Sequence, residues 1–116
     1  WDHFQGQCYY FSKDEANWTT SLESCRALGA SLAILRTEEE LGFALRCESR
    51  RNYWIGLEQR DNGWWWIDGT AFDPGFEVRA DNSCGVLNHL GIGPSFCRTQ
   101  KSWICSRPDN SVLWKE

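Results

Sequence analysis

The chain has 116 residues, a net charge of −4, six cysteines and an aromatic content of 15%. This length predicts one small domain, whose limited core would gain from covalent cross-links. The negative net charge argues against a nucleic-acid partner, because phosphate recognition needs a basic surface. The aromatic content, which includes eight tryptophans, excludes a disordered or low-complexity segment.

The cysteines predict disulfides. They form no Cys-x-x-Cys pair, and neither His3 nor His89 lies at a zinc-ligand spacing from two of them. Disulfides persist in oxidising surroundings, so we expect the domain to face the extracellular space. The chain lacks methionine at position 1 and has no stretch of about 18 apolar residues. We therefore expect a piece of a longer protein, with any membrane anchor outside this chain.

The N-terminal part predicts a strand over residues 6–11, followed by a helix. Thr20 is the expected N-cap of that helix, because Glu23 follows three residues later in the pattern of a capping box. Gly29 supplies the expected stop.

A short apolar strand over residues 32–35 is expected next, and Thr37 with Glu40 marks the start of a second helix. The acidic first turn of this helix suits the positive end of its dipole. Cys47 lies in its last turn. The residues expected to be buried are Leu41, Ala44 and Leu45.

From residue 53 onward the pattern predicts short strands separated by turn residues. Asn62-Gly63 and Asp68-Gly69 mark tight turns. The stretch from Thr70 to Ser83 has little periodicity, and loops of this length are often functional. We therefore expect an α+β domain, with two helices packed on antiparallel sheets and a long loop region. The expected strands cover residues 53–57, 64–67, 84–88, 95–98 and 103–105.

The order and spacing of several motifs resemble the C-type lectin-like domain over Phe4 to Arg107. The aromatic opening and the tryptophan run are most similar to the natural-killer-cell-receptor branch of that family. This branch comprises type II membrane receptors and their lectin-like ligands, and it mostly binds proteins. The resemblance implies a C-type lectin-like domain over residues 1–107 and a flexible tail over 108–116. The matching residues are Cys8-Tyr9-Tyr10-Phe11, Trp18, Cys25, Leu32-Ala33, Trp54-Ile55-Gly56-Leu57, Trp64 to Trp66 with Asp68-Gly69, Cys84, Cys97 and Trp103-Ile104-Cys105.

The family pattern implies that Cys25 pairs with Cys105 and that Cys84 pairs with Cys97. Cys8 and Cys47 leave two alternatives. In the longer form of this domain the partner of Cys8 lies in an N-terminal hairpin upstream of Trp1, and Cys47 is then free or bridges to another chain. We favour a Cys8–Cys47 pair, because unpaired thiols in an exported domain are prone to oxidation.

Sugar-binding members of the family hold calcium with a Glu-Pro-Asn or Gln-Pro-Asp in the long loop and a Trp-Asn-Asp before the second cysteine of the short disulfide. Here the corresponding segments are residues 72–77 and 93–96, and neither matches. Ser95 and Phe96 do not supply the oxygens that calcium needs. The resemblance therefore implies no metal and no cofactor, and the acidic residues of the loop are expected to be solvated.

Two surfaces are candidates for partner binding. Trp65 must point opposite to its neighbours on a strand, so it is either an exposed anchor or partly covered. The second surface is the long loop and the segment after it, where aromatic and charged residues alternate as in protein interfaces. Phe72 and Phe76 could instead fill a small core inside the loop. The candidates are Trp65, Phe72, Phe76, Glu77, Arg79, Asp81, Asn88, His89, Phe96, Arg98 and Gln100.

Asn17-Trp18-Thr19 is an N-glycosylation sequon, so Asn17 is a candidate glycosylation site. Catalysis finds little support, since His3 and His89 have no evident partner for a nucleophile and base.

The function that we expect is a calcium-independent extracellular recognition domain of a killer-cell-type lectin-like receptor, or of its lectin-like ligand. It would be the ectodomain of a type II membrane protein, on the extracellular face of the plasma membrane. It would bind a cell-surface protein and form a homodimer through its first strand and helix. The main alternative is a carbohydrate-binding or mineral-surface-binding lectin. A third is a soluble lectin relative in which Cys47 bridges two chains, and an enzyme is the least favoured.

Overall fold

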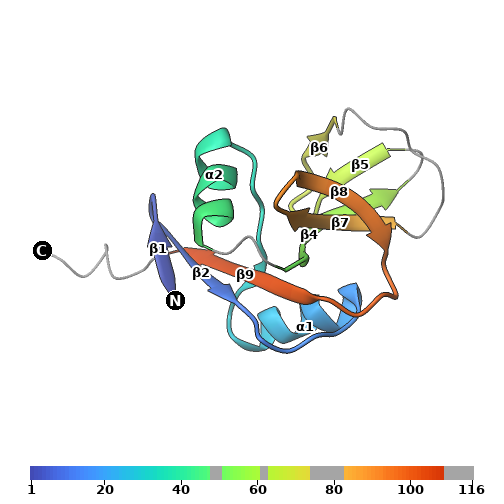
Figure 1. Ribbon diagram of the computed structural model, residues 1–116, viewed down its shortest axis with the longest axis horizontal. Helices are drawn as coiled ribbons and strands as arrows, with labels where there is room; N and C mark the ends of the chain where they lie inside the picture. The colour runs from blue at the N-terminus through green and yellow to red at the C-terminus, as the bar shows by residue number, and fades with distance from the viewer. Residues whose placement is uncertain (48–50, 61–62, 74–82, 109–116) are drawn as a thin grey trace, which may run out of the picture.

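The computed structural model describes residues 1–47, 51–60, 63–73 and 83–108. Within these ranges, two helices and nine strands form two groups that meet along β9, the long strand in the centre of Figure 1. No helix in the described ranges has the length and apolar character needed to cross a membrane. The helices are α1 (Trp18–Ala27) and α2 (Glu38–Cys47), and the strands are β1 (Asp2–Phe4), β2 (Gln7–Phe11), β3 (Ser31–Leu32), β4 (Tyr53–Arg60), β5 (Gly63–Trp66), β6 (Ala71–Phe72), β7 (Ser83–Asn88), β8 (Gly91–Phe96) and β9 (Ser102–Pro108).

The first group of strands contains the N-terminal hairpin. Gln5 and Gly6, whose φ angles are 48° and 79°, turn the chain between β1 and β2. β2 then pairs antiparallel with one edge of β9, and β3 pairs with the other edge. Strand β1, which the sequence did not predict, extends this sheet outward from β2.

Helix α1 begins earlier than predicted, so the expected Thr20–Glu23 capping box is wrong. The N-cap is Asn17, whose Oδ1 accepts a hydrogen bond from the backbone N–H of Thr20 at 2.8 Å. This start places Trp18 in the first turn, where its ring is buried and its indole N–H donates to the Ile55 carbonyl at 2.9 Å. Burial of this large ring favours the earlier start.

Helix α2 begins with the predicted capping box. The backbone N–H of Glu40 donates to Thr37 Oγ1 at 3.0 Å, and the N–H of Thr37 donates to Glu40 Oε1 at 3.1 Å. The other Glu40 oxygen lies 3.5 Å from the Tyr9 hydroxyl. Burial, followed by the negative charge of Glu40, raises the pKa of Tyr9 to about 12. Ala44 is buried as predicted, whereas Leu41 and Leu45 are half-buried.

The second group is built around β4, which pairs antiparallel with β5 and β7. β4 also lies parallel to β9, with Tyr53 opposite Ser102 and Trp54 opposite Trp103. The strand pairs are otherwise antiparallel, as expected, and the β4–β9 pair makes the sheet mixed. A parallel pair needs a long connection, which the segment carrying β5 to β8 supplies. Strand β8 begins at Gly91, four residues earlier than predicted, and ends at Phe96.

The tryptophan-rich motifs form the core, as predicted. Trp54, Trp64, Trp66 and Trp103 are all buried. Gly56 is required where β4 passes β3, because a Cβ at this position would lie 2.7 Å from the Leu32 carbonyl oxygen. The Gly56 N–H donates to the Ala33 carbonyl at 2.7 Å, so the close approach is also a backbone connection.

Both disulfides implied by the family resemblance are present. Cys25–Cys105 joins α1 to β9, and Cys84–Cys97 joins β7 to the residue that follows β8. The first links the N-terminal and C-terminal parts of the chain, and the second fixes the β7–β8 hairpin at its open end.

Cys8 and Cys47 are both unpaired, so the favoured Cys8–Cys47 disulfide is wrong for this structure. Side chains alternate along β2, and Tyr9 faces α2, where its ring lies 5.4 Å from that of Phe43. The buried side chain of Cys8 therefore faces away from α2, and its Sγ lies 3.5 Å from His3 Nδ1. Cys47 lies at the end of α2, and a disulfide requires the two Cβ atoms to face each other at close range.

Loss of each disulfide should destabilise the domain according to the loop that it closes. Replacing Cys25 and Cys105 together with alanine should lower the free energy of unfolding by about 4.5 kcal/mol, since the bridge spans 80 residues. The same change at Cys84 and Cys97, which spans 13 residues, should cost about 3 kcal/mol. Denaturant unfolding measures both values, and a larger loss for the shorter bridge would contradict this order.

The two free thiols should differ in reactivity. An aromatic disulfide reagent should modify the exposed Cys47 in the native protein and the buried Cys8 only after unfolding. Burial and then Asp2 raise the pKa of the Cys47 thiol, so its labelling should accelerate above neutral pH. Mass mapping identifies the labelled peptide, and Cys47→Ser should abolish native labelling. A peptide that joins Cys8 to Cys47 would contradict the structure.

Candidate recognition surface

The partner-binding candidates from the sequence divide into three groups. Phe76, Glu77, Arg79 and Asp81 lie outside the described residues. Trp65 and Phe72 lie on β5 and β6. The remaining candidates, Asn88, His89, Phe96, Arg98 and Gln100, lie on or beside the β7–β8 hairpin.

Trp65 and Phe72 are both partly covered. Trp65 lies on the face of β5 opposite Trp64 and Trp66, as expected, but it is half-buried, in agreement with partial cover. Phe72 packs against the main core, with its ring 5.4 Å from that of Trp66 in an edge-on arrangement. Phe72 therefore packs on the main core of the domain, and not in a separate core inside the loop.

The turn between β7 and β8 exposes an apolar side chain that the sequence did not single out. Asn88 Oδ1 accepts a hydrogen bond from the Leu90 N–H at 2.8 Å, and Gly91 takes a φ of 114°. These two constraints fix the turn, and they leave Leu90 85% exposed beside the exposed His89. The signal in the sequence was an apolar residue inside a turn bounded by asparagine and glycine.

The other end of the hairpin carries a second exposed apolar residue. Phe96 is 55% exposed, and the guanidinium carbon of Arg98 lies 6.0 Å from the centre of its ring. The turn that follows is closed by the Thr99 N–H, which donates to the Phe96 carbonyl at 2.9 Å, and Gln100 is also exposed. Leu90 and Phe96 are about 20 Å apart, given a rise of about 3.3 Å per residue along a strand.

This part of the chain is also distinct in its charge. Residues 83–108 contain no aspartate or glutamate and carry Arg98, Lys101 and Arg107, although the whole chain has a net charge of −4. We call the exposed set on and beside the β7–β8 hairpin the hairpin surface. It comprises His89, Leu90, Phe96, Arg98 and Gln100.

A second exposed cluster lies at the N-terminus. Trp1 is 42% exposed, and its ring contacts the Arg107 guanidinium at 4.3 Å and the Tyr10 ring at 5.6 Å. Arg107 also donates to the carbonyl of Leu28, which is 46% exposed. Tryptophan, tyrosine and arginine are the residues most often found at the energetic centres of interfaces. The sequence had not identified this cluster, because its members are far apart in the chain.

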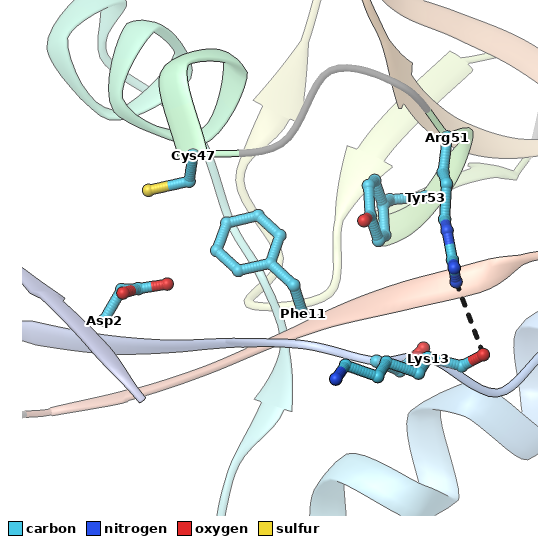
Figure 2. Close-up of a pocket in the computed structure, with 7 residues that line it drawn as sticks. Asp2, Phe11, Lys13, Cys47, Arg51 and Tyr53 are labelled. Carbon is cyan, nitrogen blue, oxygen red and sulfur yellow. Dashed lines mark hydrogen bonds between the residues drawn. The ribbon is translucent and has the colours of Figure 1, made fainter.

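Figure 2 shows a cavity of about 260 Å³ between the N-terminal hairpin, the end of α2 and the start of β4. This volume is below the roughly 300–1,000 Å³ typical of small-molecule sites. The cavity contains the thiol of Cys47. Burial raises the pKa of this thiol, which keeps it protonated at neutral pH. A protonated thiol is a weaker nucleophile than the thiolate. The residues that line the cavity are Asp2, Phe11, Ser12, Lys13, Cys47, Arg51 and Tyr53.

The segment before Cys97 forms part of β8. Ser95 is half-buried opposite Cys84, and Phe96 points to solvent. This segment offers one hydroxyl and no carboxylate to a cation. Among the described residues, no group of three or more histidine, cysteine, aspartate or glutamate side chains is placed to hold a metal ion.

The family profile for the Lectin C-type domain matches residues 2–107. Among curated relatives, C-type lectin domain family 2 member D3 of Rattus norvegicus is 40% identical over 97% of this chain and 46% of its own length. Family 2 member B of Homo sapiens is 36% identical over 92% of this chain and 72% of its own length. Early activation antigen CD69 of Homo sapiens is 29% identical over 93% of this chain and 55% of its own length. The chain thus spans about half the length of two of these relatives.

Solved structures with the same fold include the trimeric Kupffer cell C-type lectin receptor Clec4f, with a TM-score of 0.80 and 28% identity over 93% of this chain and 82% of that one. The carbohydrate-recognition domain of the human scavenger receptor C-type lectin has a TM-score of 0.82 and 26% identity over 93% of this chain and 95% of that one. The chain therefore belongs to the C-type lectin domain family, as a C-type lectin-like domain related to the family 2 members and CD69.

Proposed function

We propose that this domain is a calcium-independent extracellular recognition module that binds a protein on a cell surface. The observation that carries the proposal is the hairpin surface, where Leu90 and Phe96 are exposed in a segment without acidic residues. We infer that the partner presents apolar recesses for these two side chains and acidic groups around them.

The physical argument rests on what these side chains gain from contact. An exposed phenylalanine or leucine loses its unfavourable hydration when a partner covers it. Arg98, beside the Phe96 ring, adds a charge that selects an acidic partner and orients it. A short disulfide, Cys84–Cys97, holds the hairpin, so little conformational entropy is lost on binding.

Calcium independence is part of the proposal. Where sugar-binding members of the family place asparagine and aspartate before the second cysteine, this chain has Ser95 and Phe96. These residues offer one hydroxyl in place of the amide and carboxylate oxygens that calcium prefers.

The remaining features of the proposal concern the whole protein. Two disulfides suit an oxidising compartment, and relatives such as CD69, named as an activation antigen, support a place on the cell surface. We place the contact of a homodimer at the first strand and helix, where Trp1, next to β1, and Leu28, at the end of α1, are exposed. The type II membrane anchor would lie in a part of the protein outside this chain. We do not assign an enzymatic activity.

A carbohydrate-binding lectin remains the second candidate. It is supported by the similarity to the human scavenger receptor carbohydrate-recognition domain. The two candidates differ in what on the cell surface is bound, protein or sugar.

Binding should depend on the hairpin surface. A fluorescent streptavidin multimer of the domain should stain a subset of leukocytes, and Leu90→Ala or Phe96→Ala should each weaken staining on the order of tenfold or more, the effect of losing an interface anchor. Trypsin treatment of the cells should abolish staining, whereas removal of their surface glycans should not.

Glu39→Ala is the control, since Glu39 is exposed on α2 and belongs neither to the hairpin surface nor to the proposed homodimer contact. It should stain like the wild type. Wild-type levels of staining by both the Phe96→Ala and Leu90→Ala variants would refute the protein-binding proposal. Staining that resists trypsin and is lost after glycan removal would refute it as well.

A further inference from the structure

The Asn17 side chain combines a structural role with an accessible amide. It is half-buried at the start of α1, and its Oδ1 accepts the Thr20 N–H. The cap uses only the side-chain oxygen, so the amide nitrogen remains outside the hydrogen bond. Thr19, the hydroxyl residue of the sequon, is exposed.

The neighbours of Asn17 in sequence are bonded to both ends of one surface turn. The Trp18 N–H donates to the Cys97 carbonyl at 2.9 Å. Ala16 and Lys101 exchange two backbone hydrogen bonds, at 3.0 and 2.9 Å. Asn17 therefore lies directly beside the turn between Cys97 and Lys101. The residues inside this turn are Arg98, Thr99 and Gln100, and all three are exposed.

We infer that Asn17 carries an N-linked oligosaccharide and that its first sugars lie against the Arg98–Gln100 turn and restrict access to it. In the transfer, the Asn17 amide nitrogen forms a bond to the anomeric carbon of an N-acetylglucosamine. The bond from that carbon to the diphosphate of a lipid-linked oligosaccharide breaks, the lipid diphosphate leaves with the electron pair, and the amide gives up one proton.

The attachment point is held firmly, which gives the oligosaccharide a defined origin. The Trp54 indole N–H donates to the Ala16 carbonyl at 2.9 Å, and the Trp18 indole N–H donates to the Ile55 carbonyl at 2.9 Å. The Asn17 carbonyl accepts from the Ser21 N–H and hydroxyl at 2.9 and 2.7 Å. With the backbone fixed on both sides of Asn17, the first sugar cannot swing far from the turn.

One consequence rests on the proposed function, because Arg98 and Gln100 belong to the hairpin surface. The oligosaccharide would narrow the approach of a partner from this end and leave Leu90, at the far end of β8, uncovered. Glycosylation at Asn17 would thus regulate the same surface that the proposal assigns to recognition.

The test compares two neighbouring threonines in protein secreted from mammalian cells. Thr19→Ala removes the sequon and leaves the Asn17 cap intact. Thr20→Ala is the matched control, because the cap uses only the backbone N–H of Thr20. Arginine modification by phenylglyoxal, mapped by mass spectrometry, measures the access to Arg98 relative to Arg26, an exposed arginine in the last turn of α1.

The wild type and Thr20→Ala should carry a peptide-N-glycosidase-sensitive mass, and Thr19→Ala should not. The ratio of Arg98 to Arg26 modification should rise several-fold in Thr19→Ala. It should rise equally when the oligosaccharide is removed enzymatically from folded wild type, which excludes misfolding of a variant as the cause. An unglycosylated wild type, or an unchanged ratio after removal, would overturn the inference. Because no partner is present, failure of the proposed function leaves this result unaffected.

Discussion

The fold depends on β9, since this one strand holds both groups of strands together. It pairs antiparallel with β2 and β3 and parallel with β4. Its Cys105 is bonded to α1, and its Trp103 exchanges hydrogen bonds at 2.9 Å with the buried Ser12. The first and last parts of the chain must therefore meet before either sheet is complete. A small domain gains from such a closure, because its core alone buries limited apolar surface.

This arrangement leaves the β7–β8 hairpin at the far end of the molecule from the N-terminal sheet (Figure 1). Strand β7 packs into both core clusters, through Leu87 on one face and Val86 on the other, while the turn of the hairpin and its last residue remain exposed. The guanidinium of Arg98, beside the Phe96 ring, favours acidic groups on a partner, as the proposed recognition requires.

Much of the frame could be predicted from the sequence, because it rests on local signals and a specific motif order. The Thr37–Glu40 capping box and the buried tryptophans were correct, as were the two disulfides implied by the resemblance. The errors came from contacts between distant residues. The start of α1 depends on the Trp18 bond to Ile55, and the Cys8–Cys47 pair failed because alternation along β2 separates the two thiols. The exposed Leu90 required knowledge of the turn, and the Trp1–Arg107 contact joins the two ends of the described chain.

The central claim is that the domain recognises a protein through the hairpin surface without a metal ion. Thermal unfolding in millimolar calcium and in excess chelator tests directly whether the domain holds a metal ion, because an ion that binds only the native state must raise the melting temperature. The account predicts the same melting temperature in both solutions. A melting temperature that rises with calcium concentration and returns to its original value with chelator would contradict it.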